Sequence, residues 1–273
     1  MAENPIIDAA ALLDRIGEPG LVLVDVRPAP DWSAGTIPGA ISLDVYDYFI
    51  SRSDERGIDA MARAASRAMA ALGLDRARTT VFFEAQTGMI SPRGLWFHEL
   101  LGGKGLILDG GIETWKAAGG PIAPGAGMCD AIDPQRLAVL PTAFRRGLVA
   151  SIEEVEHCDR LGADLLDVRR RSEFGGSFAH PCCARSGRIP NAKFLFWEDF
   201  LQHGRYRAAD EIAERAEGAG LSRERPIITY CHRGARAATA LYGLRLAGFE
   251  ARIFVGSWHE WAADALRPVC SGA

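Results

Sequence analysis

The stretch LVLVDVR at residues 21–27 decides the fold of this chain, because a degenerate copy, ADLLDVR, recurs at residues 163–169. Three further matches follow in the same order. They pair IPGA at 37–40 with IPNA at 189–192, VFFE at 81–84 with ITYC at 228–231, and GGIETW at 110–115 with GSWHEW at 256–261. An ordered series of this kind indicates an internal repeat, and therefore two domains of one architecture. The second copy carries an insertion between its first two landmarks.

Each copy alternates short apolar runs with longer amphipathic stretches. Apolar runs of this length are typical of strands in parallel sheets that helices cover on both faces. The predicted strands cover residues 21–24, 80–83, 106–108, 165–166, 226–230 and 252–255. The predicted helices cover residues 59–72, 92–101, 209–219 and 235–247. We therefore predict an α/β protein in which each half is an open, mainly parallel sheet flanked by helices.

The length also favours two domains, since 273 residues exceed the roughly 100–200 of most single domains. Residues 121–144 are rich in Pro, Gly and Ala, with prolines at 121, 124, 134 and 141, which is typical of a linker. We predict a first domain over residues 1–124, a linker over 125–145 and a second domain over 146–273.

Composition excludes several classes of function. The formal charge of −4 predicts no large cationic surface for nucleic acid. No segment approaches the roughly 18 apolar residues that span a bilayer, and residues 1–20 lack the basic start and apolar run of a secretory signal. We therefore expect a cytoplasmic protein without a membrane partner. In that compartment the six cysteines are expected to be free thiols.

The segment TYCHRGARAA at residues 229–238 carries the chemistry. It places Cys231 between the end of a buried strand and the start of an Ala-rich helix, with Gly234 allowing a tight turn. Backbone N–H groups in such a turn, the helix dipole, Arg233 and Arg236 all favour negative charge. A thiolate is the nucleophilic form of cysteine, so the segment predicts a reactive Cys231. A cysteine that merely packs at a strand end would lack these flanking groups.

The combined motifs resemble the rhodanese family over nearly the whole chain. Residues 231–236 look like that family's Cys-x-x-Gly-x-[Arg/Thr] loop, and residues 167–176 look like its Asp-x-Arg segment that ends in [Tyr/Phe]-x-Gly. RIPNA at 188–192 resembles its His-Ile-Pro-Gly-Ala segment. GSWHEW at 256–261 resembles the ending of tandem thiosulfate and mercaptopyruvate sulfurtransferases. The resemblance implies two rhodanese-like domains, the first inactive and the second catalytic.

The same resemblance assigns roles to individual residues. Cys231 is the predicted catalytic nucleophile. The residues expected to bind substrate or to line the mouth of the site are His232, Arg233, Gly234, Ala235, Arg236, Arg169 and Arg188. Asp167 is expected to give structural support. For Arg169 a purely structural ion pair with Asp167 is an equally open interpretation. Arg188 stands where the family has histidine, which leaves its role open.

Other positions receive structural interpretations. Glu84 occupies the place of Cys231 in the first copy, where a carboxylate cannot carry sulfur, and we interpret it as a solvated loop acid. Trp258 and Trp261 are expected in the core. Cys182 and Cys183, in the insertion, are either a resolving or acceptor thiol pair or, as we prefer, incidental thiols of an exposed loop. We predict no metal site, because no CxxC pair occurs and adjacent cysteines suit tetrahedral zinc poorly.

The resemblance implies two displacements without a metal or organic cofactor. Cys231 takes the outer sulfur of a small anionic donor as a persulfide and passes it to cyanide or a thiol. We expect thiosulfate as the donor for two reasons. His232 and Arg233 put basic residues after the cysteine, and Glu173 stands where mercaptopyruvate enzymes have a carboxylate-binding arginine. Mercaptopyruvate remains the alternative, with Arg170, Arg171 or Arg185 as substitutes for that arginine.

Three rival functions use the same loop differently. A cysteine phosphatase needs Cys-x₅-Arg to surround a phosphoryl group, but the sixth residue after Cys231 is Ala237, and Arg236 comes one position early. A non-enzymatic binding module would form no stable persulfide. A persulfide carrier that does not turn over would keep the whole loop, so that alternative stays open.

Overall fold

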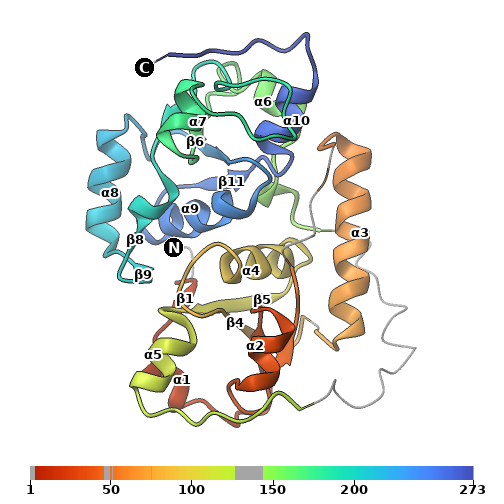
Figure 1. Cartoon of the computed structure of the whole chain (residues 1–273), viewed down its shortest axis with the longest axis vertical. Coiled ribbons are helices and arrows are strands. Elements are labelled where there is room, and N and C mark those ends of the chain that lie inside the picture. Colours follow the sequence, from red (N-terminus) through yellow and green to blue (C-terminus); the bar gives the residue numbers. More distant parts are fainter. Residues whose placement is uncertain (1–3, 46–49, 51, 75, 127–143, 273) are drawn as a thin grey trace.

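The computed structural model describes residues 4–45, 50, 52–74, 76–126 and 144–272. Figure 1 shows two α/β domains, the first occupying the lower part of the view and the second the upper part. Most of the predicted linker, residues 127–143, lies outside the described residues, so the proposed domain limits stay a prediction. The predicted fold class is confirmed by two separate sheets whose strands are parallel.

The first domain is built on a five-stranded sheet in the order β1-β5-β4-β2-β3. All its neighbouring pairs are parallel. Its strands are β1 (Ile6–Ile7), β2 (Leu21–Asp25), β3 (Ile41–Ser42), β4 (Thr79–Phe83) and β5 (Lys104–Leu108). The surrounding helices are α1 (Ala9–Leu13), α2 (Ala29–Ala34), α3 (Glu55–Ala71), α4 (Ser91–Leu100) and α5 (Gly111–Ala117).

The second domain repeats this topology. Its parallel sheet has the order β11-β10-β6-β7, and an isolated parallel bridge from Val149 to Ile253 takes the place of β1 at the outer edge. The strands are β6 (Asp164–Asp167), β7 (Lys193–Phe194), β10 (Ile227–Tyr230) and β11 (Ala251–Ile253), with a separate antiparallel hairpin of β8 (Leu201–Gln202) and β9 (Arg205–Tyr206). The helices are η2 (Arg146–Leu148), α6 (Ile152–Glu156), α7 (Arg171–Gly175), η3 (Trp197–Phe200), α8 (Ala209–Gly218), α9 (Ala235–Leu246) and α10 (Ser257–Ala263).

The repeat determines which strands are central. The two aspartates of the DVR motifs end β2 and β6, and Asp25 pairs in register with Phe83 as Asp167 does with Tyr230. Glu84 and Cys231 therefore follow equivalent central strands, β4 and β10, at the carboxyl edges of their sheets. Ligands of open α/β sheets bind outside that edge, so the topology brings the predicted loop to the expected place.

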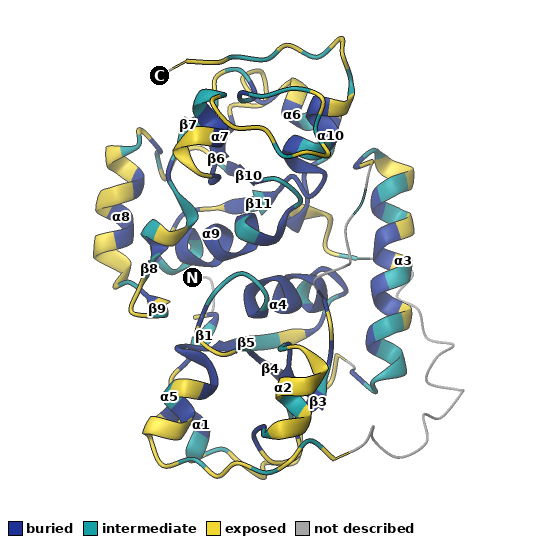
Figure 2. Ribbon diagram, viewed as in Figure 1, coloured by how far each residue is buried: buried dark blue, intermediate teal, exposed yellow. Residues whose placement is uncertain are grey.

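The helices that follow these two central strands, α4 and α9, pack against each other between the domains. Figure 2 shows both in dark blue, in contrast with the exposed outer face of α8. Glu99 of α4 accepts hydrogen bonds from Tyr242 at 3.0 Å and from Arg245 at 2.8 Å, both on α9. Thr239 of α9 donates to the carbonyl of Gly88 at 2.7 Å. The domains thus share one buried helix pair.

The helix and strand limits predicted from the sequence agree with the structure to within a few residues. The largest difference is α3, which begins at Glu55 rather than residue 59, because the Asp54 carboxylate accepts the Gly57 N–H and caps the helix earlier. Within the part of the chain that the structure describes, every helix falls short of the length and apolarity needed to cross a bilayer.

Candidate active site

Cys231 lies directly after β10 and four residues before the body of α9, as the sequence predicted. Its residue is 1% exposed, and its Sγ accepts the backbone N–H of Gly234 at 3.0 Å. Ala235, the first residue of α9, is also buried. The sulfur is therefore buried in polar surroundings, since a backbone N–H and the positive end of a helix face it.

Gly234 is required by the shape of this turn. Its φ of +88° lies in the left-handed region, where a side chain is strained. A Cβ there would also lie 3.1 Å from both the Cγ2 and the carbonyl oxygen of Val255. Because Val255, two residues after the end of β11, approaches so closely, only glycine presents its N–H to Cys231 in this way.

Ser257 holds the other side of Cys231. Its buried Oγ accepts the N–H of Cys231 at 3.2 Å and donates to the carbonyl of Phe254 at 2.8 Å. Its φ of +54° is uncommon for a residue other than glycine. This serine belongs to the GSWHEW motif, for which no role in the loop was predicted. The feature that could have indicated a role for Ser257 is its position directly after a glycine in the motif that ends each copy of the repeat.

The guanidinium of Arg236 contacts a carboxylate and is not free to bind a substrate anion. It forms a two-pronged ion pair with Glu173, at 2.7 and 3.1 Å, and both side chains are largely buried. Burial alone would raise the pKa of Glu173, but the hydrogen bonds and charge of Arg236 lower it to about 2. Burial would likewise lower the pKa of Arg236, yet Glu173 and the charge of Cys231 raise it. The loop is thus less cationic than its sequence indicated.

Arg233 connects the loop to the first domain. Its carbonyl oxygen accepts a hydrogen bond at 3.1 Å from Arg93, a buried residue of α4. The two residues are 140 positions apart in the chain. The first domain therefore supports the backbone of the predicted catalytic loop, a role that the sequence analysis did not find, because nothing local marks Arg93.

His232 differs from the basic residue that was expected. Burial, followed by the positive charges of its neighbours, lowers its pKa to about 3, so the imidazole is neutral near neutral pH. Its ring stacks on that of His180 at 3.9 Å with an interplanar angle of 8°. One of the two basic side chains that favoured thiosulfate is therefore uncharged.

Arg169 supports the structural interpretation of its role. It forms an ion pair with Asp167 at 2.5 Å and donates to the carbonyl of Gly187 at 2.7 Å, with its side chain 1% exposed. The first copy has the same arrangement, in which Arg27 pairs with Asp25 at 2.6 Å and donates to the carbonyl of Gly35. Because the copy without the cysteine keeps this pair, the pair belongs to the fold rather than to sulfur chemistry.

Arg188 contacts the C-terminal tail of the chain. Its guanidinium donates to the carbonyl of Gly272 at 2.7 Å and lies 4.4 Å from the centre of the Phe174 ring. Its backbone forms an antiparallel bridge with Cys270. These contacts hold the C-terminal tail against the domain, and the expectation that Arg188 lines the mouth of the site stays a prediction.

Glu84 corrects a second interpretation, because it is not a solvated acid. Its Oε1 accepts the backbone N–H groups of Gly88, Ile90 and Ser91 at 3.1, 3.0 and 2.8 Å, and the Ser91 hydroxyl at 2.9 Å. Burial raises the pKa of this carboxyl, and these hydrogen bonds oppose the rise. The turn before α4 thus binds an anion from its own chain, in the place where the second copy has Cys231.

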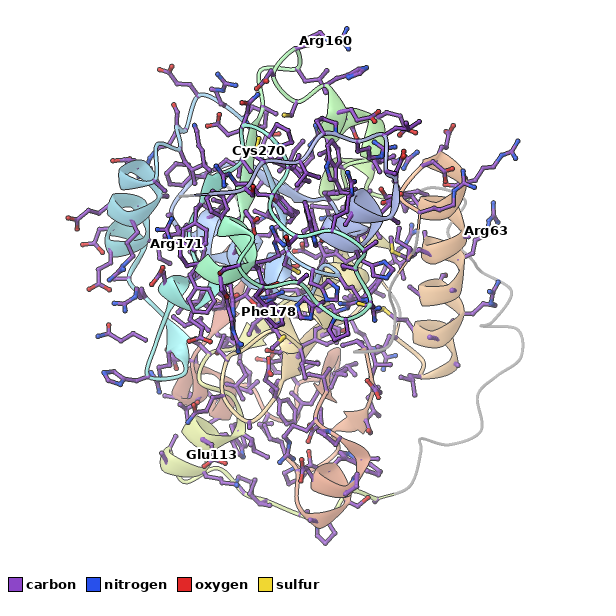
Figure 3. The ribbon with its side chains drawn as sticks, turned by 45° about the horizontal axis from the view of Figure 1, so that its top comes forward. Arg63, Glu113, Arg160, Arg171, Phe178 and Cys270 are labelled. Atoms are coloured by element: carbon purple, nitrogen blue, oxygen red, sulfur yellow. The ribbon has the colours of Figure 1, made fainter. Side chains whose placement is uncertain are left out.

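The insertion of the second copy folds over the loop. Cys182 and Cys183 each place Sγ 3.4 Å from the Nε2 of His232, and His180 lies 3.1 Å from Glu173. Figure 3 labels Phe178 of this segment, an exposed residue whose ring lies edge-on to His180. The two thiols therefore lie next to the predicted loop, with Cys182 exposed and Cys183 half-buried, and the interpretation that they are incidental stays a prediction.

Two other predictions concern side chains around the site. Trp258 and Trp261 are 1% and 2% exposed, which confirms their place in the core. Arg185 cannot replace a substrate-binding arginine, since its guanidinium donates to the carbonyls of Ala262, Arg267, Trp261 and Asp264. Arg171 lies 4.0 Å from the centre of the Phe194 ring.

A buried cysteine at the carboxyl edge of a parallel sheet, in a short turn before a helix, defines a class of α/β protein with a cysteine-centred anion loop. The family model of the Rhodanese-like domain matches residues 8–118 and again 153–264, and the chain belongs to this family. The first matched range covers β2 to β5, and the second contains β6, β7, β10 and β11.

Individual relatives carry two kinds of name. The chain is 30% identical to a "Probable 3-mercaptopyruvate sulfurtransferase" of Pseudomonas aeruginosa, over 100% of both chains. It is 27% identical to a "Thiosulfate sulfurtransferase" of Azotobacter vinelandii, over 97% of this chain and 96% of the relative. The solved structure of SseA from Escherichia coli, titled as a 3-mercaptopyruvate sulfotransferase, is similar with a TM-score of 0.77, 24% identity, and coverage of 93% and 99%.

Proposed function

We propose that the chain is a sulfurtransferase that carries sulfane sulfur as a persulfide on Cys231. The observation that carries the proposal is the hydrogen bond from the Gly234 N–H to Sγ at 3.0 Å, made at the N-terminus of α9. A fixed N–H and a helix dipole stabilise negative charge on the thiolate and on the terminal sulfur of a persulfide. Ser257 and Gly234 pre-organise this turn before substrate arrives.

The reaction consists of two displacements that balance in atoms and electrons. The Cys231 thiolate attacks the outer sulfur of thiosulfate, the S–S bond of the donor breaks, and sulfite leaves with the electron pair. Cyanide or a thiolate then attacks the terminal sulfur of the persulfide, and the Cys231 thiolate is regenerated. The chain needs no redox partner when cyanide is the acceptor, because thiocyanate is the product.

Thiosulfate is the proposed donor. At the position where the resemblance puts a carboxylate-binding arginine, Glu173 presents a buried acid that already engages Arg236. Arg185 is engaged by backbone carbonyls elsewhere, and Arg171 is exposed and lies over the Phe194 ring. Glu173 cannot bind the carboxylate of mercaptopyruvate as an arginine at its position would, whereas thiosulfate has no carboxylate and can be held by the loop N–H groups and Arg233.

3-Mercaptopyruvate is the second candidate donor. The observation that favours it is the 30% identity over the whole chain to the relative of that name. The neutral imidazole of His232 also makes the loop less basic than thiosulfate transfer was expected to require. The acceptor, whether cyanide or a thiol, is proposed on the chemistry of the persulfide alone.

Steady-state kinetics with each donor test the function. We expect thiocyanate formation from thiosulfate and cyanide with a higher kcat/KM than from 3-mercaptopyruvate. We also expect a mass increase of one sulfur atom on the protein after donor alone. Cys231→Ser should abolish both readouts, and Cys270→Ser, which removes a half-buried thiol near the C-terminus, should preserve them.

Each alternative has its own outcome. A higher kcat/KM for mercaptopyruvate would reverse the donor assignment and keep the family chemistry. A stable persulfide without turnover would identify a carrier instead of an enzyme. Hydrolysis of p-nitrophenyl phosphate without thiocyanate formation would favour a phosphatase. Sulfur transfer that survives in Cys231→Ser would remove the mechanism.

A further inference from the structure

Two thiols and an imidazole converge beside the catalytic loop. The Sγ atoms of Cys182 and Cys183 each lie 3.4 Å from the Nε2 of His232. These three ligand atoms all lie within 4.8 Å of one another. Two of the residues come from the insertion, and the third, His232, is 50 positions further along the chain from Cys182.

The spacing matches the coordination shell of a tetrahedral d¹⁰ cation. With Zn–S near 2.3 Å and Zn–N near 2.05 Å, a sulfur and a nitrogen bound to one zinc ion stand about 3.6 Å apart. The observed 3.4 Å is close to that value for both thiols. Two sulfurs on one zinc ion stand about 3.8 Å apart, which falls inside the 4.8 Å limit of the cluster.

The imidazole is held in this orientation by its neighbours. The ring of His232 stacks on His180 at 3.9 Å, and His180 in turn lies 3.1 Å from the carboxylate of Glu173. The stack therefore fixes the plane of the His232 ring, and the contact of His180 with Glu173 fixes the stack. Cys182 is exposed and Cys183 is half-buried, so an ion reaches the thiols from solvent.

We infer that Cys182, Cys183 and His232 form a site for one thiophilic divalent cation, zinc or its analogue cadmium. The two thiols lose their protons as the two metal–sulfur bonds form, and the imidazole nitrogen gives its lone pair. Three protein ligands leave a fourth position open to water or to another small ligand. Two adjacent cysteines alone suit tetrahedral zinc poorly, and the imidazole of His232, which is distant in sequence, supplies the third ligand.

Occupancy of this site blocks sulfur transfer, a consequence that rests on the proposed function. His232 follows Cys231 directly, so a metal on its Nε2 fixes the side chain next to the nucleophile. The bound ion also links the insertion, through Cys182 and Cys183, to His232 of the loop, and so closes the side of the loop that faces Cys182. The site therefore makes the proposed activity sensitive to the concentration of free thiophilic metal.

The site itself is tested without any enzyme activity. Cadmium is titrated into Cys231→Ser, which lacks the nucleophile as a competing ligand, while sulfur-to-cadmium charge transfer is followed in the ultraviolet. We expect one equivalent per chain. In this background, adding Cys182→Ser and Cys183→Ser together should weaken the affinity for cadmium by more than about 100-fold. Loss of a group that only supports a ligand already costs up to about 100-fold, and this change removes two ligands.

Matched variants in the same background distinguish this site from other thiols. Cys231→Ser combined with Cys270→Ser removes one half-buried thiol elsewhere and should bind cadmium as before. Replacing His232 by Asn should weaken binding at least about tenfold and keep the charge-transfer band. Circular dichroism confirms that each variant is folded. Undiminished binding after loss of both Cys182 and Cys183 would overturn the site.

Regulation is tested separately on the chain that retains Cys231. The variant lacking Cys182 and Cys183 should keep its metal-free rate of thiocyanate formation, while the zinc concentration for half-inhibition rises at least about tenfold relative to the unmodified chain. Equal inhibition of both proteins would overturn the regulatory part and leave the metal site standing. A metal-free chain without sulfur transfer would refute the proposed function, and the cadmium titration would still decide the site.

Discussion

Replacing Glu173 by Gln tests how the charge of the catalytic loop is held. The substitution keeps the shape of the side chain and removes the negative charge that two hydrogen bonds from Arg236 reach at 2.7 and 3.1 Å. The side chains are 2% and 13% exposed, so solvent does not replace the lost partner. Breaking a buried pair by removing one member costs about 3–5 kcal/mol, because the other charge is left uncompensated.

The amide oxygen of Gln still accepts one hydrogen bond from Arg236, so we expect the lower end of that range, about 3 kcal/mol. For a protein of this size such a loss lowers Tm by roughly 6–12 °C. Urea unfolding followed by circular dichroism measures the free energy, and calorimetry measures Tm. Glu217→Gln is the matched control, since its pair with Arg223 is 57% and 51% exposed and should change the free energy by less than about 1 kcal/mol.

The pH dependence gives the same reasoning a second test. The pKa of Glu173 is lowered by folding from its ordinary value of 4.5 to about 2. Its contribution to stability is therefore fully present above pH 4.5 and is lost as pH falls toward 2. The difference between the unmodified chain and Glu173→Gln should narrow over that interval. Equal unfolding free energies of the two proteins at pH 7 would refute the account of a buried, stabilising pair.

Two further substitutions probe the turn around the nucleophile. Gly234→Ala forces a side chain into the left-handed region against Val255 and moves the N–H off Sγ, so kcat/KM for thiosulfate should fall roughly 10–100-fold, the equivalent of one hydrogen bond to a charged group; an unchanged rate in the thiocyanate assay would contradict it. Ser257→Ala leaves the buried N–H of Cys231 without its acceptor, which should cost about 1–3 kcal/mol in urea unfolding. Ser177→Ala, at an exposed position, serves as control and should match the unmodified chain.

The sequence predicted the framework because its signals are local. Strand and helix limits follow from runs of apolar residues, and the repeat related the two halves before any contact was known. The position of Cys231 between a strand and a helix followed from the same reasoning. The strand and helix limits depend on residues only a few positions apart, and the repeat is visible by comparing one chain with itself.

The contacts that complete the site join residues that are distant in sequence. Arg93 and Arg233 are 140 positions apart, and the buried hydrogen bonds from Ser53 to Glu260 span 207. The spacing of apolar residues along the chain carries no information about such pairs, since these contacts form only when the folded domains pack against each other. The charge of His232 was misjudged for the same reason, because its burial depends on the insertion that folds over it.

The shared helix pair has a consequence for the copy of the domain that lacks a nucleophile. Nine of the twelve residues of α9 are buried, and α4 covers one side of them. A chain shortened to its second half would expose that apolar surface to water and leave the Arg233 carbonyl without Arg93. The half without a cysteine at this position therefore serves as a permanent cover for the half that carries Cys231, and its turn at Gly88 contributes to that cover.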